Sequence, residues 1–272
     1  MLPEAGGRPR PMRSRWPAAA GARRTGADAG AMRIVVAPDA DAAARHAAGF
    51  VARRAARAVR ARGRFALALS GGRTPLAMLQ WLAREPVDWR RVELFQVDER
   101  AAPRGSGERN LSGLERLLLS RVPIPRAQVH AMPVDEPDLE AAAAAHAGTL
   151  AGALGEPPVL DLVHLGLGSD GHTASLMPGD AATRVADAWV AATDAHGGWR
   201  RMTLTLPAID AARCVLWLVC GASKAPMLGR LMLGDPTIPA GLVRRDRARV
   251  VADEEAAALL PRRSAAPGRA RS

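Results

Sequence analysis

The chain has no long hydrophobic segment and only two cysteines among its 272 residues. No apolar run approaches the roughly 18 residues that span a bilayer, and the first residues lack the hydrophobic core of a secretory signal, so we expect a cytoplasmic protein with no membrane contact. Cys214 and Cys220 lie in one apolar stretch that is predicted to be a strand. Six residues of strand measure about 20 Å, well beyond the roughly 7 Å limit for the Cα atoms of a disulfide. The two cysteines therefore cannot pair with each other, and we interpret them as buried thiols in a reducing compartment.

Lysine is almost absent, since Lys224 is the one lysine among 38 basic residues. Arginine thus supplies nearly every positive charge of this chain. The single lysine is either a chance occurrence or a position where a compact ammonium does what a planar guanidinium cannot.

Acidic residues are scarce at both ends of the chain. Residues 1–31 carry six arginines against two acids, and residues 261–272 carry four arginines and no acid, so residues 32–260 hold only +3 of the formal charge of +11. Both ends are rich in Ala, Pro, Gly and Arg without apolar periodicity, which predicts disorder. The first thirty residues also resemble a transit peptide in composition, and Met32 is an alternative start. Because the charge belongs to these tails, nucleic-acid binding is the less favoured interpretation.

Between the tails there is no Pro/Ser-rich linker and no internal repeat, so we expect a single domain over residues 32–260. Strand-like and helical patterns alternate along it, which predicts an α/β fold with a mainly parallel sheet covered on both faces. The expected strands are 33–37, 65–69, 92–97, 128–132, 159–165, 202–206 and 213–220. The expected helices are one from Asp39 to Gly63, then 75–84, one capped by Asn110, 137–154, 222–233 and 253–260.

A glycine pair follows the strand 65–69, in the segment Ser70-Gly71-Gly72-Arg73-Thr74-Pro75. Thr74 before Pro75 suits the N-cap and first turn of a helix. Free amides at such a helix start, together with the Ser70 and Thr74 hydroxyls, form a phosphate cradle, although an ordinary strand–helix turn has the same appearance.

Two further segments place charge at strand ends. Asp98-Glu99-Arg100 follows the strand 92–97 and could hold a sugar hydroxyl and a phosphate, but a solvated charge cluster is the simpler interpretation of this tripeptide alone. Lys224 follows the strand 213–220 and falls in the first helical turn, where the helix dipole disfavours a cation unless an anion is bound.

The apolar run 159–165 leads into Gly166-Leu-Gly-Ser-Asp-Gly-His-Thr-Ala-Ser-Leu-Met-Pro178. This pattern places Asp170 and His172 in a tight turn at the carboxyl end of a strand, where open α/β sheets bind ligands. His172 can accept a proton near neutral pH, which makes an enzyme the leading interpretation.

The other histidines carry no such signal. His46 and His146 lie on Ala-rich helices and are expected to face solvent, His130 and His164 lie in strands, and His196 lies in a loop. No pair has the spacing of metal ligands, so we expect no metal and no cofactor.

Taken together, these segments resemble the 6-phosphogluconolactonase family over about residues 33–260. The matching motifs are Ser-Gly-Gly-x-Thr-Pro at 70–75, Asp-Glu-Arg at 98–100 after Trp89, Gly-x-Gly-x-Asp-Gly-His-Thr-Ala-Ser-Leu at 166–176, Arg-x-Thr at 201–203 and Gly-x-x-Lys at 221–224. This chain departs from the family pattern at Ser169, at Met177, and at Arg109-Asn110, where the family has Ser-Asn.

The resemblance implies a Rossmann-like three-layer α/β/α sandwich and hydrolysis of 6-phospho-D-glucono-1,5-lactone to 6-phospho-D-gluconate, a step of the oxidative pentose phosphate pathway. It assigns His172 and Asp170 to catalysis, with Asp170 either orienting His172 or binding the sugar. It assigns substrate binding to the following residues: Ser70, Gly71, Gly72, Thr74, Asp98, Arg100, Gly168, Arg201 and Lys224. The partner is a small phosphosugar lactone, and the sequence leaves open a monomer or a dimer.

Two alternatives remain. Glucosamine-6-phosphate deaminases share the fold and the Asp-Gly-His turn, but they have a Glu seven residues after the Asp, where this chain has Met177. They also have Tyr after Asp-Glu, where this chain has Arg100. A phosphosugar-binding module without catalysis would lack the base, whereas His172 is present. The absence of Gly-x-Ser-x-Gly disfavours a serine-nucleophile hydrolase.

Overall fold

The computed structural model describes residues 32–261, so the predictions for the two tails lie outside the described residues, Pro261 excepted. Its centre is a seven-stranded sheet in the order β1-β10-β9-β6-β2-β3-β5, in which all paired neighbours are parallel. Its strands are β1 (Arg33–Ala37), β2 (Phe65–Leu69), β3 (Val92–Gln96), β5 (Val129–His130), β6 (Leu162–Leu165), β9 (Val215–Val219) and β10 (Ala248–Asp253). A small antiparallel sheet has the order β4-β8-β7, with β4 (Asp98–Arg100), β7 (Val190–Ala192) and β8 (Arg201–Leu204).

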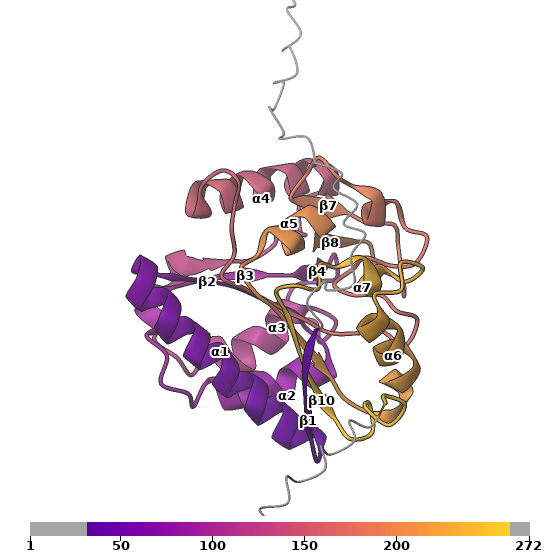
Figure 1. Cartoon of the computed structure of the whole chain (residues 1–272). Coiled ribbons are helices and arrows are strands. Elements are labelled where there is room, and N and C mark those ends of the chain that lie inside the picture. The colour runs from indigo at the N-terminus through magenta and orange to yellow at the C-terminus, as the bar shows by residue number, and fades with distance from the viewer. Residues whose placement is uncertain (1–31, 262–272) are drawn as a thin grey trace, which may run out of the picture.

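Helices cover both faces of the large sheet (Figure 1). One face carries α1 (Ala40–Arg62), α2 (Arg73–Leu82) and α3 (Asn110–Leu114), which continues as a π-helical turn over Glu115–Leu119. The other carries α4 (Leu139–Leu154), α5 (Leu206–Ala211), α6 (Ala225–Leu233) and α7 (Pro239–Leu242), together with the small sheet. Short 3-10 turns occupy Trp89–Arg91, Arg126–Gln128, Ala181–Arg184 and Ala222–Lys224. The α/β class and the mainly parallel sheet are confirmed.

Strand β2 shows how the sequence forms these layers. All five of its residues are buried, because a central parallel strand has protein on both faces. Phe65, Leu67 and Leu69 pack into the core under α1 and α2, whereas Ala66 and Ala68 pack into the core on the other face. Full burial of a side chain such as Phe65 or Leu67 stabilises the fold by about 1.5–3 kcal/mol.

Helix α1 begins and ends as the sequence predicts. The Asp39 carboxylate accepts a hydrogen bond from the Ala42 amide at 2.8 Å, and Gly63 ends the helix with φ of 75°. No helix among residues 32–261 combines the length and the apolar character needed to cross a bilayer.

Several predictions about individual elements were wrong. Residues 253–260 do not form a helix, because Asp253 ends strand β10 and residues 254–259 form turns. The strand predicted at 202–206 is present as β8, but it ends at Leu204 because Thr205 is the N-cap of α5, and it lies in the small antiparallel sheet. Cys214 and Cys220 flank β9, and Cys220 is only partly buried; both thiols are free.

Candidate active site

A cavity of about 600 Å³ opens at the carboxyl ends of β2, β6, β9 and β10. Ten of the eleven predicted site residues line it: Ser70, Gly71, Gly72, Thr74, Asp98, Arg100, Gly168, His172, Arg201 and Lys224. The eleventh, Asp170, contacts His172 instead of forming part of the wall. The structure thus brings together residues from segments more than 150 positions apart in the chain.

The glycine pair after β2 allows a sharp turn and a close approach. Gly72 has φ of 100°, a conformation that a side chain disfavours. At Gly71 a Cβ atom would lie 1.9 Å from the side-chain oxygen of Asn110, so only glycine fits there. Ser70 fixes the start of this turn to strand β6, because its hydroxyl donates to the His164 carbonyl at 2.7 Å. The proton of that hydroxyl is therefore used within the protein.

Helix α2 begins at Arg73, one residue before the predicted Thr74 cap, and Gly72 is its N-cap. The Thr74 prediction fails because Gly72 already supplies the non-helical turn. No side chain caps this end. The first amides of a helix have no partner within the helix, and the macrodipole adds partial positive charge there. An uncapped helix start on a cavity wall is suited to bind an anion.

In the segment Asp98–Arg100, alternate residues face different surroundings. Asp98 and Arg100 line the cavity, whereas Glu99 points inward and is fully buried. The Glu99 carboxylate accepts hydrogen bonds from the backbone amides of Asn110 and Leu111, both at 2.8 Å. Glu99 therefore caps α3, and Asn110, predicted to be the cap, is instead the first residue of that helix.

Asp98 is held by two side chains. Its Oδ2 accepts from the Ser175 hydroxyl at 2.7 Å, and the Asn110 side-chain amide donates to its backbone carbonyl at 2.9 Å. Burial raises the pKa of Asp98, while the Ser175 hydrogen bond and then the charges of Arg201, Arg100 and His172 oppose that rise. The two arginines and the imidazole therefore lie within electrostatic range of a single carboxylate.

Arg100 and Arg201 are direct neighbours across the β4–β8 pair, and both line the cavity. Like charges in this arrangement repel, so it is unfavourable unless negative charge lies close by. Burial and then the neighbouring Arg100 lower the pKa of Arg201. Asp98 and Glu108, which pairs with Arg100 at 3.3 Å, offset part of this repulsion, and a bound anion would offset more.

The turn after β6 holds the predicted catalytic pair. The Nδ1 atom of His172 lies 2.5 Å from Oδ1 of Asp170, and the His172 amide donates to the same oxygen at 3.1 Å. Burial raises the pKa of Asp170, but the hydrogen bond from the His172 amide and the charge of the imidazole outweigh this effect and lower the pKa overall. An ionised Asp170 can only accept, so Nδ1 of His172 carries the proton and Nε2 is left as the basic nitrogen.

Gly168 leaves room for this pair. A Cβ atom at Gly168 would lie 2.1 Å from Nδ1 of His172 and 2.4 Å from Oδ1 of Asp170. The turn is also fixed to its surroundings, since the Thr173 hydroxyl donates to the Gly166 carbonyl at 2.9 Å and the Gly171 carbonyl accepts from the Ala240 amide at 3.0 Å. The side chains of the turn are therefore set on a rigid backbone.

Lys224 lies at the end of the 3-10 turn after β9, as the residue preceding α6. Gly221 starts this turn with φ of 94°, and its amide donates to both carboxylate oxygens of Asp253, at 3.0 and 2.9 Å. Asp253 thereby fixes the turn that carries Lys224. This role is not visible in the sequence, in which Asp253 falls at the start of a predicted helix.

The remaining histidines differ in part from expectation. His146 is buried and not solvent-facing as predicted, and burial lowers its pKa to about 4. His130 pairs with Glu93 and His196 with Asp180. Within residues 32–261 no three His, Cys, Asp or Glu side chains form a group that could hold a metal ion.

The fold and the site define a class: an α/β protein whose cavity, at the carboxyl ends of the parallel strands, is lined by a helix start without a side-chain cap, by two arginines and a lysine, and by a histidine that a carboxylate orients. Residues 38–252 match the family described as glucosamine-6-phosphate isomerases/6-phosphogluconolactonase. The chain belongs to this family.

Named relatives support the membership. The chain is 40% identical over 218 residues to 6-phosphogluconolactonase of Mycobacterium tuberculosis, covering 75% of this chain and 88% of that protein. It is 36% identical over 250 residues to 6-phosphogluconolactonase of Streptomyces coelicolor, covering 85% and 95%. The solved structure of 6-phosphogluconolactonase from Thermotoga maritima superposes with a TM-score of 0.74 at 29% identity, covering 82% and 99%.

Proposed function

We propose that this chain hydrolyses 6-phospho-D-glucono-1,5-lactone to 6-phospho-D-gluconate. The observation that carries the proposal is the joint presence, around one cavity, of the His172 imidazole oriented by Asp170, an uncapped start of α2, and Lys224. A general base and a phosphate site are the two parts that this reaction needs. The names of the relatives over most of the chain agree with a lactone-hydrolysing enzyme.

His172 acts as the general base. Its Nε2 takes a proton from a water molecule, whose oxygen attacks C1 of the lactone and forms a tetrahedral intermediate. The intermediate then collapses with cleavage of the bond between C1 and the ring oxygen. The imidazolium returns the proton to that departing oxygen, which leaves a free acid and a hydroxyl group. The ionised Asp170 orients the imidazole and stabilises its protonated form.

The phosphate of the substrate occupies the other part of the cavity. The uncapped first amides of α2 bind its oxygens, Thr74 adds a hydroxyl, and Lys224 supplies positive charge. This anchoring fixes the lactone carbonyl near His172, which lowers the entropic cost of the reaction.

The charge that develops on the carbonyl oxygen needs a donor. The Gly168 amide is already bonded to the His172 carbonyl and the Gly171 amide to the Gly168 carbonyl, so these amides of the turn are engaged. We assign oxyanion stabilisation to the Arg100 and Arg201 pair, whose mutual repulsion falls when negative charge forms beside it. Glu108 and the His196 carbonyl hold the guanidinium groups of Arg100 and Arg201 respectively, and Asp98 beside them contacts sugar hydroxyls.

A deaminase activity is the second candidate, because the family includes glucosamine-6-phosphate isomerases. Met177 stands where a ring-opening Glu is expected in such enzymes, and it is buried and absent from the cavity wall. A thioether there cannot transfer a proton, which favours the lactonase.

The proposed test compares the two reactions on one preparation. Acid release from freshly made 6-phosphogluconolactone and ammonia release from glucosamine-6-phosphate are measured side by side. We expect accelerated lactone hydrolysis and no ammonia. Ammonia release without lactone hydrolysis would reject the proposal, and activity on neither substrate would favour a binding module.

We further propose that residues 32–260 form a single domain, that the enzyme acts in the cytoplasm, and that it needs no cofactor. The continuity of the parallel sheet from β1 to β10 supports the single domain. A chain of residues 32–260 is expected to keep full turnover.

A further inference from the structure

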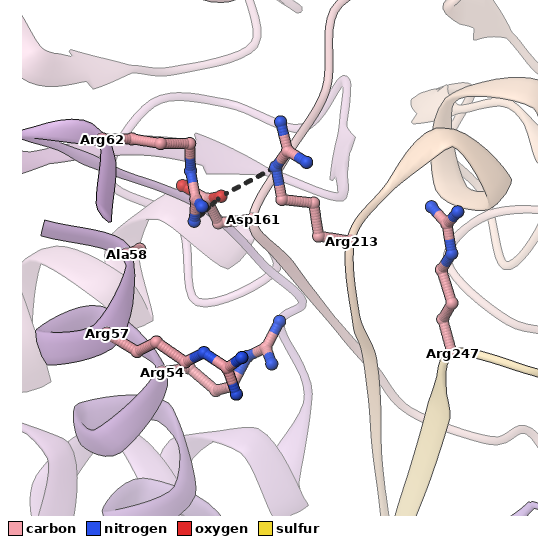
Figure 2. A pocket seen from close by; sticks show the side chains of 7 residues that line it. All are labelled: Arg54, Arg57, Ala58, Arg62, Asp161, Arg213 and Arg247. Carbon is pink, nitrogen blue, oxygen red and sulfur yellow. Dashed lines mark hydrogen bonds and ion pairs between the residues drawn. The ribbon is translucent and has the colours of Figure 1, made fainter. Parts of the chain in front are cut away.

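A second cavity, of about 310 Å³, is lined mainly by arginines (Figure 2). Its wall consists of Arg54, Arg57, Ala58, Arg62, Asp161, Arg213 and Arg247. We call it the arginine pocket. It shares no residue with the candidate active site and does not depend on the proposed function.

The arginine pocket lies at the amino ends of the parallel strands, whereas the candidate active site lies at their carboxyl ends. Asp161, Arg213 and Arg247 come directly before or within two residues of the starts of β6, β9 and β10, so they lie at the amino ends of these parallel strands. Helix α1 runs back from the end of β1 to the start of β2, so its last turns reach the same edge and contribute the other three arginines. A strand of five residues is about 17 Å long, so this distance separates the arginine pocket from the candidate active site.

Asp161 fixes two of the five guanidinium groups. Its Oδ1 accepts from Nη2 of Arg62 at 2.6 Å and lies 3.3 Å from Nε of Arg213. Its Oδ2 accepts from the Ala66 amide at 3.0 Å, and the carboxylate is buried. Asp161 is thus fully engaged: it orients two arginines and neutralises one charge.

The other three arginines have no such partner. Within residues 32–261, Arg54, Arg57 and Arg247 form no ion pair with a carboxylate. Five guanidinium groups against one carboxylate leave a net charge of +4 at this pocket. Residues 32–260 as a whole carry only +3, so the charge is concentrated here and is not a general property of the surface.

This concentration of charge indicates an anionic ligand. Clustered like charges raise the free energy of the folded state unless a counter-charge is near. Guanidinium groups match phosphate oxygens in pairs, and several of them around a small cavity can contact more than one phosphate group. The volume lies at the lower end of the roughly 300–1,000 Å³ of ligand pockets. The wall contains no aromatic side chain on which a base could stack.

We propose that the arginine pocket binds a small polyphosphate anion, one with two or three linked phosphate groups. Arg54 and Arg57 of α1 lie on one side of the pocket, and Arg213 and Arg247 lie on the loops before β9 and β10 (Figure 2). The phosphates lie between these two pairs of arginines. The recognised chemistry is the phosphate chain, which inorganic tripolyphosphate and a nucleoside triphosphate share.

The test is isothermal titration of the full chain with tripolyphosphate, ATP and orthophosphate at constant ionic strength. The pocket variant carries Arg54→Gln, Arg57→Gln and Arg247→Gln. The control variant carries Arg90→Gln, Arg91→Gln and Arg121→Gln, three exposed arginines outside both cavities, so the net charge of the two variants is equal. Lactone hydrolysis by both variants reports that they are folded.

We expect tripolyphosphate to bind the unaltered chain and the control alike, orthophosphate to bind far more weakly, and the dissociation constant of the pocket variant to rise about tenfold or more. Equal affinity for tripolyphosphate and ATP would identify the phosphate chain alone as the ligand, and tighter ATP binding would add the nucleoside. Equal affinity of the two variants overturns the proposal.

Discussion

Replacing Gly168 with alanine tests the geometry of the catalytic turn. The added Cβ would lie 2.1 Å from Nδ1 of His172, 2.4 Å from Cε1 of the same ring and 2.4 Å from Oδ1 of Asp170. Ordinary contacts between carbon atoms need about 3.5 Å, so the imidazole and the carboxylate must both move by more than about 1 Å. A misplacement of about 1 Å at a reacting group can lower the rate roughly 10²-fold. We therefore expect kcat for the 6-phospho lactone to fall about 10²-fold.

The same turn offers a matched control. A Cβ added at Gly166 meets no atom within 4 Å, although Gly166 also lines the cavity. Gly166→Ala should therefore leave kcat within a few-fold, with any effect falling on KM. Because His172 and Asp170 are partly exposed and can move aside, Gly168→Ala should change Tm by only a few degrees. Initial rates on freshly prepared lactone, together with thermal melts, measure both. Equal kcat for the two variants would refute the argument.

Three further predictions follow from named groups. Lys224→Ala should raise KM for the 6-phospho lactone about tenfold or more, and it should change KM for unphosphorylated gluconolactone much less. Lys224→Arg should not fully restore the KM of the unaltered chain. Equal losses on both substrates would show that Lys224 does not bind the phosphate. Burial raises the pKa of Asp210 to about 6, so its carboxylate destabilises the fold as the pH rises from about 4 through 6. Asp210→Asn should accordingly increase the free energy of unfolding by at most about 3 kcal/mol at pH 8 and by little at pH 4, measured by urea denaturation; a destabilised variant at pH 8 would contradict this. Burial lowers the pKa values of His146 and His164 to about 4, so the stability that their neutral forms retain above about pH 6.5 is lost as the pH falls toward 4. Protonation of each histidine should lower the free energy of unfolding by about 2 kcal/mol by pH 5, and His146→Leu should reduce this loss. An unchanged pH dependence in the variant would show that His146 does not titrate.

The parts of the fold that the sequence predicts best are those with strong local signals. Apolar runs such as 65–69 form central strands because both their faces are buried, and the Asp39 and Gly63 signals set the limits of α1. The strands of the small sheet span only three or four residues, too short for periodicity to show, so β4 and β7 were missed.

Tertiary contacts account for the other errors. Residues 253–260 have a helical composition, and the Asp253 carboxylate accepts from the Ala256 amide as an N-cap would, but Asp253 itself belongs to β10, its carboxylate also accepts from the Gly221 amide, and the residues after it form only turns. His146 lies on a helix made largely of alanine, where no polar face indicates which side is buried. At the candidate site, the glycine turns and their flanking residues were predictable from the motif. The supporting groups Glu99 and Asp253 were not, because their partners lie on other elements.

The most direct test of the central claim is the turnover of His172→Ala on 6-phosphogluconolactone, corrected for spontaneous hydrolysis and accompanied by a thermal melt. If the Nε2 atom of His172 is the base that activates water, kcat should fall by about 10²-fold or more while Tm stays near that of the unaltered chain. A variant that keeps its kcat within a few-fold would contradict the assignment of His172 as the base and the mechanism built on it.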